Sequence, residues 1–503
     1  MRWTPCFHCY TSYPRSRRKR VYMYVVLNLC MMFTECLLNQ TSSGVILPAD
    51  LQTLESYSRR IKHIHLSTFK EKVSNHIYSS ITQHLFNNNS CLFSALRCFT
   101  IHKFNGISEG NLVILPLIAS SSLSVIKIHG VTDAIEIHLA SFLHGIANSH
   151  PSPSSTIHAL SSLFLDGIIK MSTLAQLENF KKLSTLEIKF HEDFSNAIFS
   201  SLSRLPSLSA LSLSAYFAYD LESPAKPVVY SFSNLRRLIL GGNGNAVLRI
   251  LRSIYGERLL RVFLGFGRHS TTDTLQACVK RCPEMAPHML FYFIFLHPSE
   301  DPHRNVFPPL PNNYAQLRSF NIKSAVTIPL EHFRNLFDHV RMGLWSALET
   351  LGLHFGGDPK EPLKNWHGIQ QVVPLSSLSV FVASCPRLRT LDLYLYYPFD
   401  EGDRETRILE DYIQNSQSNH KLANLKIVFL DPFVTVPRPG GVMDAVTVSL
   451  FIDHLFPNLQ SFDISDMVGD VRRDWYSGIK AMVKNYRNMR ERKVVKGAPI
   501  VSK

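Results

Sequence analysis

The body of the chain repeats one short pattern of apolar positions. An apolar residue is followed three positions later by a second and two positions after that by a third. The second and third residues flank one variable residue, as in a strand with a single buried face. The pattern occurs fourteen times, with its middle residue at Ile64, Phe99, Ile126, Leu163, Leu186, Leu211, Leu238, Val262, Phe293, Phe320, Leu351, Leu391, Val428 and Phe462. The sequence therefore predicts fourteen short strands.

The segments between these patterns predict helices. Ile198, Leu202 and Leu205, for example, lie at helical spacing between two patterns. Middle residues recur at intervals of 23 to 40 residues, which leaves room for full helices and inserted loops. A strand repeated in this way, with a helix on the return path, is typical of a leucine-rich-repeat solenoid. The predicted fold class is α/β, a leucine-rich-repeat solenoid of about fourteen irregular repeats whose curved parallel sheet is lined outside by helices.

Several strings around the pattern resemble the repeat half of fungal F-box/leucine-rich-repeat proteins. They are residues 54–64, 384–393 with a Cys-Pro-x-Leu lead-in, 455–462 with a Phe-Pro-x-Leu lead-in, and a closing helix at 473–492. The resemblance covers about residues 50–490. It implies a substrate receptor of a cullin-type ubiquitin ligase, in which an F-box docks the adaptor and the repeats hold a protein substrate.

The F-box itself is not recognisable in this sequence. Its usual Leu-Pro opening is represented only by Leu47-Pro48, which leads directly into the first repeat. Two readings stay open: a ligase subunit with a degenerate F-box, and a stand-alone or truncated repeat protein that binds a protein partner. The predicted domains are a disordered or apolar leader at 1–46, a repeat arc at 47–470, and a basic capping helix and tail at 471–503.

The positive charge of the chain is concentrated at its two ends. The net charge is +14, from 53 Lys and Arg against 39 Asp and Glu. Residues 1–20 hold six basic residues and no acid, and residues 471–503 hold ten basic and two acidic residues. The body between them is therefore neutral, so we expect a protein partner and not nucleic acid. The basic run at 17–20 leaves a nuclear import signal open.

The N-terminal segment has the outline of a targeting signal. A basic cluster at 15–20 precedes an apolar run at 21–33, but Asn28 interrupts the run and Glu35 follows it closely. We expect a leader that packs on the first repeats, no stable membrane span, and an intracellular location in cytoplasm or nucleus. A membrane anchor through residues 21–38 is the alternative.

The sequence offers little that could carry catalysis or hold a metal. A G-x-S-x-G string at 106–110 begins five residues beyond Ile101, too far from the strand for a nucleophile elbow. Cys6 and Cys9 supply only half of a zinc ligand set. Nine cysteines without a regular ladder favour a reduced compartment. We predict no enzymatic activity, no cofactor and no metal.

The residue between the second and third apolar positions of each pattern is expected to face the concave side. Ile239, Phe263 and Ile294 occupy this position on three successive strands and would form one apolar patch, at about 4.8 Å per strand. His354 and Tyr394, at the flanking position, are predicted to form its rim. These five residues are the predicted partner-binding site. Two alternatives stay open: a loop at 298–311 covers the patch, or the assigned register is shifted by one residue.

Overall fold

The structure is a computed structural model of the 503-residue chain. It describes residues 52, 55–66, 81–85, 91–101, 115–148, 159–192, 197–215, 228–267, 270–296, 316–324, 345–355, 375–395, 402–415, 418–429, 442–466 and 473–496. The predicted leader at 1–46 and the G-x-S-x-G string at 106–110 lie outside these residues. The chain divides into two compact units, residues 1–165 and 166–503.

Fourteen strands form one sheet and follow one another in it in chain order. They are β1 (His63–Leu66), β2 (Cys98–Ile101), β3 (Val125–Val131), β4 (Ser162–Gly167), β5 (Thr185–Phe190), β6 (Ala210–Ala215), β8 (Arg237–Gly242), β10 (Arg261–Phe266), β11 (Phe291–Leu296), β12 (Ser319–Ser324), β13 (Thr350–Phe355), β14 (Thr390–Leu395), β15 (Asn424–Phe429) and β16 (Ser461–Asp466). Neighbouring strands such as β8 and β10 pair in parallel. Each predicted strand coincides with one of these, so the predicted α/β repeat fold is confirmed.

In the described residues, helices occupy many of the return paths between strands. The first unit contains α4 (Leu115–Ile118) and α5 (Asp133–Asn148). The second unit contains α6 (Met171–Gln176), η2 (Leu177–Asn179), α7 (Ala197–Ser203), α8 (Gly244–Ser253), α9 (Thr272–Met285), η3 (Leu375–Ser377), α11 (Leu378–Ser384), α12 (Gly402–Asn415), α13 (Val442–Leu455) and α14 (Arg473–Lys496). A separate two-stranded sheet pairs β7 (Tyr230–Ser231) with β9 (Ile254–Tyr255).

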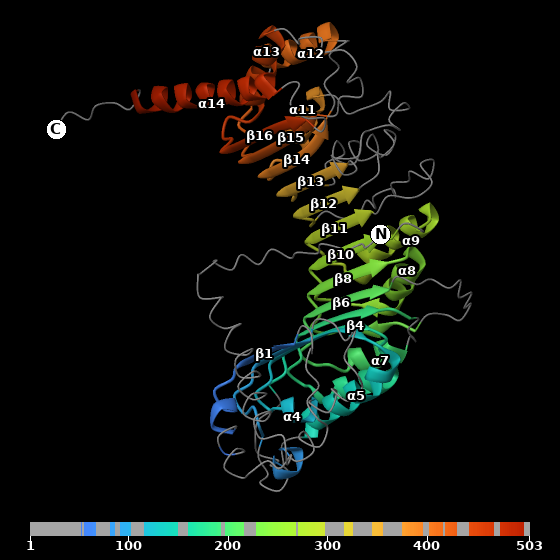
Figure 1. Ribbon diagram of the computed structural model, residues 1–503. Helices are drawn as coiled ribbons and strands as arrows, with labels where there is room; N and C mark the ends of the chain where they lie inside the picture. Colours follow the sequence, from blue (N-terminus) through green and yellow to red (C-terminus); the bar gives the residue numbers. More distant parts are fainter. Residues whose placement is uncertain are drawn as a thin grey trace, which may run out of the picture. The chain divides into compact units, whose positions relative to one another are not determined.

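The core of the second unit lies between the sheet and its helices. Figure 1 shows α8 and α9 along one side of the stacked strands β8 and β10. The apolar residues of the β8 pattern, Leu238 and Leu240, are fully buried, as are Val247 and Ile250 of α8. Each fully buried side chain of this size contributes about 1.5–3 kcal/mol relative to exposure. The repeat pattern therefore marks the residues that hold each strand to its helix.

A shared carbonyl sets the spacing from one repeat to the next. The backbone N–H groups of Leu260 and Arg261 both donate to the carbonyl of Arg236, each at 3.0 Å. In the following repeat, Leu290 and Phe291 donate in the same way to the carbonyl of Leu260. These bonds use main-chain atoms alone, so the start of each strand is held in register independently of its side chains.

The end of β8 requires glycine. Gly242 has φ +140°, and a Cβ built there would lie 1.8 Å from the carbonyl oxygen of Ala215. The chain then enters α8 through Asn243, whose side chain accepts a hydrogen bond from the N–H of Asn245 at 3.0 Å. Close backbone approach followed by an N-cap fixes the direction in which α8 leaves the sheet.

Candidate protein-binding face

Side chains on the strands of the second unit alternate between two faces of the sheet. Buried residues point to the helices, and the residues between them are half-buried or exposed, as in the alternating pattern of β8 and β10. We call this second side, which carries the residues between the buried positions, the variable face. Register places Ile239 of β8 beside Phe263 of β10, and Phe263 beside Phe293 of β11. Two predicted site residues, Ile239 and Phe263, therefore lie side by side on the variable face.

The assignment of Ile294 to this face was wrong. Its side chain is 1% exposed and belongs to the core, next to Tyr292 of the same strand, which is also buried. All six residues of β11 are apolar, so alternation could not distinguish its two faces, and a shift of one residue exchanged them. Phe293 occupies the place that was predicted for Ile294.

The same shift affects β15. Register pairs Leu391 with Leu425 and Leu393 with Ile427, so Leu425 and Ile427 point to the core, and Val428 is buried as well, at 6% exposure. Lys426 therefore lies on the variable face, where its Nζ is 3.7 Å from Oδ2 of Asp392 on β14. The lysine between two apolar residues was the signal that could have set this register from the sequence.

The remaining two predicted residues occupy strands farther along the sheet. His354 pairs in the backbone register with Lys323 of β12, and Tyr394 pairs with Val428 of β15. Their strands, β13 and β14, are three and four positions from β10 in the order of the sheet. At about 4.8 Å per strand, this separates them from Phe263 by roughly 14 and 19 Å. Their side chains lie outside the described part of the structure.

Arginines accompany the aromatic residues of β10 and β11. The guanidinium carbon of Arg237 lies 5.2 Å from the ring centre of Phe263, and that of Arg261 lies 4.9 Å from the ring centre of Phe291. The rings of Phe263 and Phe293 are 5.9 Å apart and tilted by 40°. Each arginine is thus stacked on a phenylalanine of the following strand, which restrains both side chains. Arg237, Arg261, Phe291 and Phe293 were not predicted as site residues.

We name the group formed by Arg237, Ile239, Arg261, Phe263, Phe291 and Phe293 the arginine–aromatic strip. Beside it, the third variable-face positions of β8 and β10 are Gly241 and Gly265. A Cβ at Gly241 would lie 3.1 Å from Oγ of Ser214, so small side chains are packed closely at this place. The strip therefore combines large, half-buried rings with neighbouring glycine positions that have no side chain. This combination suits insertion of a partner side chain.

The charge on this face is distributed unevenly along the sheet. Among the described side chains, the variable face of β8, β10, β11 and β12 carries Arg237, Arg261 and Lys323 and no acid. Acids occur beyond it, at Glu187 of β5, which is 4.0 Å from Nζ of Lys189, and at Asp392 of β14. The strip is therefore a positively charged segment of a face whose flanks carry ion pairs.

The buried cysteines of the second unit are poor nucleophiles. Burial raises the pKa of Cys282 and of Cys385 to about 12, and it also raises the pKa of Cys278. All three thiols are therefore protonated at neutral pH, whereas a nucleophilic cysteine needs a thiolate. Within the described residues, no group of three or more His, Cys, Asp or Glu side chains is arranged to hold a metal ion.

Ion pairs within the chain neutralise part of the positive charge of the C-terminal helix. Nη2 of Arg490 donates to Oδ1 of Asp453 on α13 at 2.6 Å, and Arg487 Nε lies 2.9 Å from Oε1 of Glu491. Lys480 of α14 pairs with Asp463 of β16. The pairs with Asp453 and Asp463 attach α14 to the last repeat, and all three pairs reduce the charge that the helix offers to other molecules.

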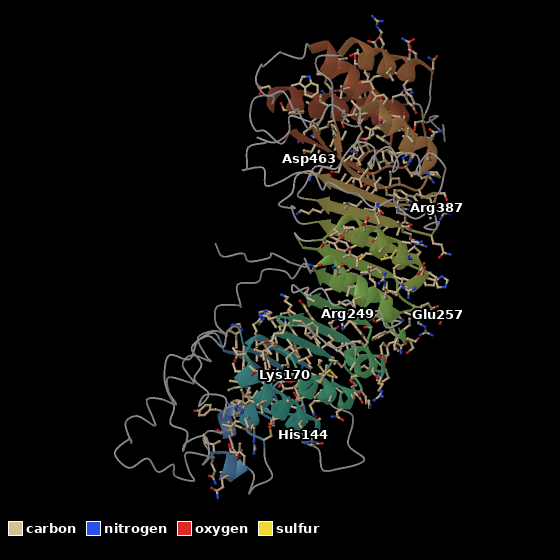
Figure 2. All side chains as sticks on the ribbon, turned by 90° about the vertical axis from the view of Figure 1, so that its right-hand side faces the viewer. His144, Lys170, Arg249, Glu257, Arg387 and Asp463 are labelled. Atoms are coloured by element: carbon tan, nitrogen blue, oxygen red, sulfur yellow. The ribbon has the colours of Figure 1, made fainter. Side chains whose placement is uncertain are left out.

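The helical side of the sheet presents a different surface. Figure 2 shows this side and labels Arg249 on α8, which packs against β8 and β10.

Among the described helices, none is both long enough and apolar enough to cross a bilayer.

No protein-family model matches the chain, and no curated protein matches its sequence. Among solved structures, it is similar to an internalin from Listeria monocytogenes, with 12% identity over 86% of this chain and 90% of the other and a TM-score of 0.35. It is also similar to the yeast complex of Rad7 and Elc1, with 15% identity over 85% of this chain and 97% of the other and a TM-score of 0.30. At these values, neither likeness assigns a role to a residue of this chain.

Proposed function

We propose that the chain is a non-enzymatic protein-recognition scaffold and that the arginine–aromatic strip is its binding surface. The observation that carries the proposal is the row Ile239, Phe263 and Phe293, three apolar side chains that neighbour one another on the variable face instead of pointing into the core. Large apolar groups at the centre of a polar surface are typical of binding hot spots. The neutral body and the protonated buried thiols favour binding over catalysis.

The test is a selection of short random peptides displayed on phage against the full chain. We expect peptides whose binding depends on Phe263. The Phe263→Asp substitution places a charge at the centre of the strip. It should weaken the binding of these peptides by about thirtyfold, which corresponds to a loss of about 2 kcal/mol at a hot spot.

Ile408→Asp is the matched control. Ile408 is an exposed apolar residue of α12, 43% exposed, and lies away from the strip. The Ile408→Asp substitution should leave peptide binding unchanged. If Phe263→Asp and Ile408→Asp bind the selected peptides equally well, the strip is not the binding surface. Circular dichroism at rising temperature confirms that both variants remain folded.

We further propose that the scaffold serves as the substrate-holding part of a ubiquitin-ligase receptor. This finer role rests on the resemblance of the Cys-Pro-x-Leu and Phe-Pro-x-Leu lead-ins at 385–388 and 456–459 to those of F-box/leucine-rich-repeat proteins. Co-purification with a cullin-ligase adaptor at micromolar concentration tests it. Lack of co-purification favours a stand-alone scaffold and leaves the binding surface unaffected.

A further inference from the structure

We infer that the arginine–aromatic strip binds a polypeptide segment in which carboxylate side chains flank an apolar or aromatic side chain. The inference rests on the proposed function and specifies the chemistry of the partner. The apolar side chain would cover Ile239, Phe263 and Phe293, and the carboxylates would pair with Arg237 and Arg261.

The first argument is the position of the two arginines. Backbone register places Arg261 of β10 directly beside Arg237 of β8, so two positive charges occupy neighbouring strands on one face. Like charges at paired positions of a sheet destabilise it. An anionic group bound between them would offset this repulsion.

The second argument is the restraint on the guanidinium groups. The guanidinium carbons of Arg237 and Arg261 each lie over a phenylalanine ring, at 5.2 and 4.9 Å from its centre. Nε of Arg237 is buried, so the donors that this arginine would offer to a ligand are its two terminal nitrogens. Such a restrained group can donate two parallel hydrogen bonds to one carboxylate at a lower entropic cost than a mobile side chain.

The third argument is the limited extent of the charge. Single-stranded nucleic acid needs a positive track that follows several phosphates. Here the positive segment covers β8 to β12, and the variable face carries Asp392 and Glu187 beyond it. A short acidic and apolar peptide matches this extent better than a phosphate backbone.

The peptide selection described above tests the inference through the composition of the selected peptides. We expect enrichment of Asp and Glu next to Phe, Trp or Leu. The same selection on the Arg237→Glu/Arg261→Glu double variant should enrich Lys and Arg instead. Phe263-dependent peptides without acidic enrichment would overturn this inference and leave the proposed function standing, whereas a selection without Phe263-dependent peptides would overturn both.

One selected peptide, labelled with a fluorophore, then provides affinities by polarisation. Arg261→Ala should weaken the affinity for this peptide by about tenfold, because one charge-assisted contact is lost. Arg249→Ala, on the helical side of the sheet, is the matched control and should bind like the parent chain (Figure 2). Equal affinities for Arg261→Ala and the parent would contradict the inference, as would displacement of the peptide by an equimolar oligothymidylate.

Discussion

Nδ1 of His420 accepts a hydrogen bond from the backbone N–H of Leu422, at 3.1 Å. In neighbouring repeats the equivalent N–H donates to a backbone carbonyl three residues earlier, as from Leu388 to Cys385 at 3.0 Å and from Leu459 to Phe456 at 3.1 Å. The imidazole thus replaces a turn carbonyl. Its Nε2 is 2.8 Å from the carbonyl oxygen of Cys385, which accepts the ring proton. One neutral histidine therefore joins two repeats.

This arrangement predicts a loss of stability in mild acid. Burial lowers the pKa of His420 below its usual value of 6.5. As the pH falls through 6.5, the unfolded chain therefore binds a proton that the folded chain excludes, and the free energy of unfolding decreases. Protonation would also remove the acceptor that Leu422 needs. Melting temperatures between pH 7 and pH 5 should fall.

His420→Gln supplies the control for this pH dependence. The variant lacks the titrating ring, so its melting temperature should start lower at pH 7 and change less between pH 7 and pH 5 than that of the parent. If the two proteins show the same change over this range, another histidine is responsible.

The corrected register of β11 is tested by two neighbouring substitutions. Ile294→Asp places a carboxylate in the core, where the present side chain is 1% exposed, and should cost at least about 3 kcal/mol of stability. Phe293→Asp changes the variable face and should reduce peptide binding with a smaller effect on stability. Urea unfolding measures both. The reverse ranking of the two variants would restore the register first predicted.

Gly242→Ala should strongly destabilise the second unit. The new Cβ would lie 1.8 Å from the oxygen of Ala215, and the φ of +140° is itself costly for alanine. We expect a loss of at least about 3 kcal/mol, from the strained conformation together with the steric overlap. The matched control is Gly478→Ala in α14, where nothing lies within 4 Å of the new Cβ. It should stabilise the helix by about 1 kcal/mol, so similar melting temperatures for the two variants would contradict the prediction.

The ion pair between Arg490 and Asp453 should anchor the C-terminal helix. Burial raises the pKa of Asp453, and Arg490 opposes that effect. Arg490→Gln should cost about 1–2 kcal/mol, a value reduced because the arginine side chain is 38% exposed. Arg487→Gln removes the pair with the exposed Glu491 and one hydrogen bond from Nη1 to the carbonyl oxygen of Gln460, and it should cost less, about 0.5–1 kcal/mol.

Acid should partly reverse the Arg490→Gln defect. Without the arginine, the pKa of Asp453 rises further above its unfolded value, so the folded chain binds the proton more readily as the pH falls from 7 to 5. Proteolytic cleavage of α14 is a direct measure of its attachment. A defect that grows in acid would rule out this role of the pair.

The sequence predicted the strands better than the faces that they present. In β8, Arg237 precedes the two leucines and Gly241 follows them, so the buried set is evident from the pattern. In β11 all six residues are apolar, and the burial of Tyr292 and Ile294 depends on the neighbouring strands. One local signal was available: Pro287 precedes Met289 by two residues, the same spacing as Pro386 and Leu388. Aligning these prolines would have set the correct register.

The arginine–aromatic contacts were less accessible to prediction. Arg237 contacts Phe263, which lies 26 residues later in the sequence. The contact exists only because the register pairs their two strands. Likewise, nothing in the pattern marks His420, because its role arises from replacing a carbonyl of the main chain. Both features combine a local side-chain preference with a long-range pairing that the repeat pattern does not contain.

The carbonyl shared by Leu260 and Arg261 has an evolutionary consequence. Because each repeat attaches to the previous one through main-chain atoms at this point, any residue with a backbone N–H can occupy the donor positions, and only proline is excluded. Residues on the variable face can then be exchanged one at a time without altering the pitch of the sheet. Such a scaffold can acquire new partners by gradual surface substitution while its architecture is inherited unchanged.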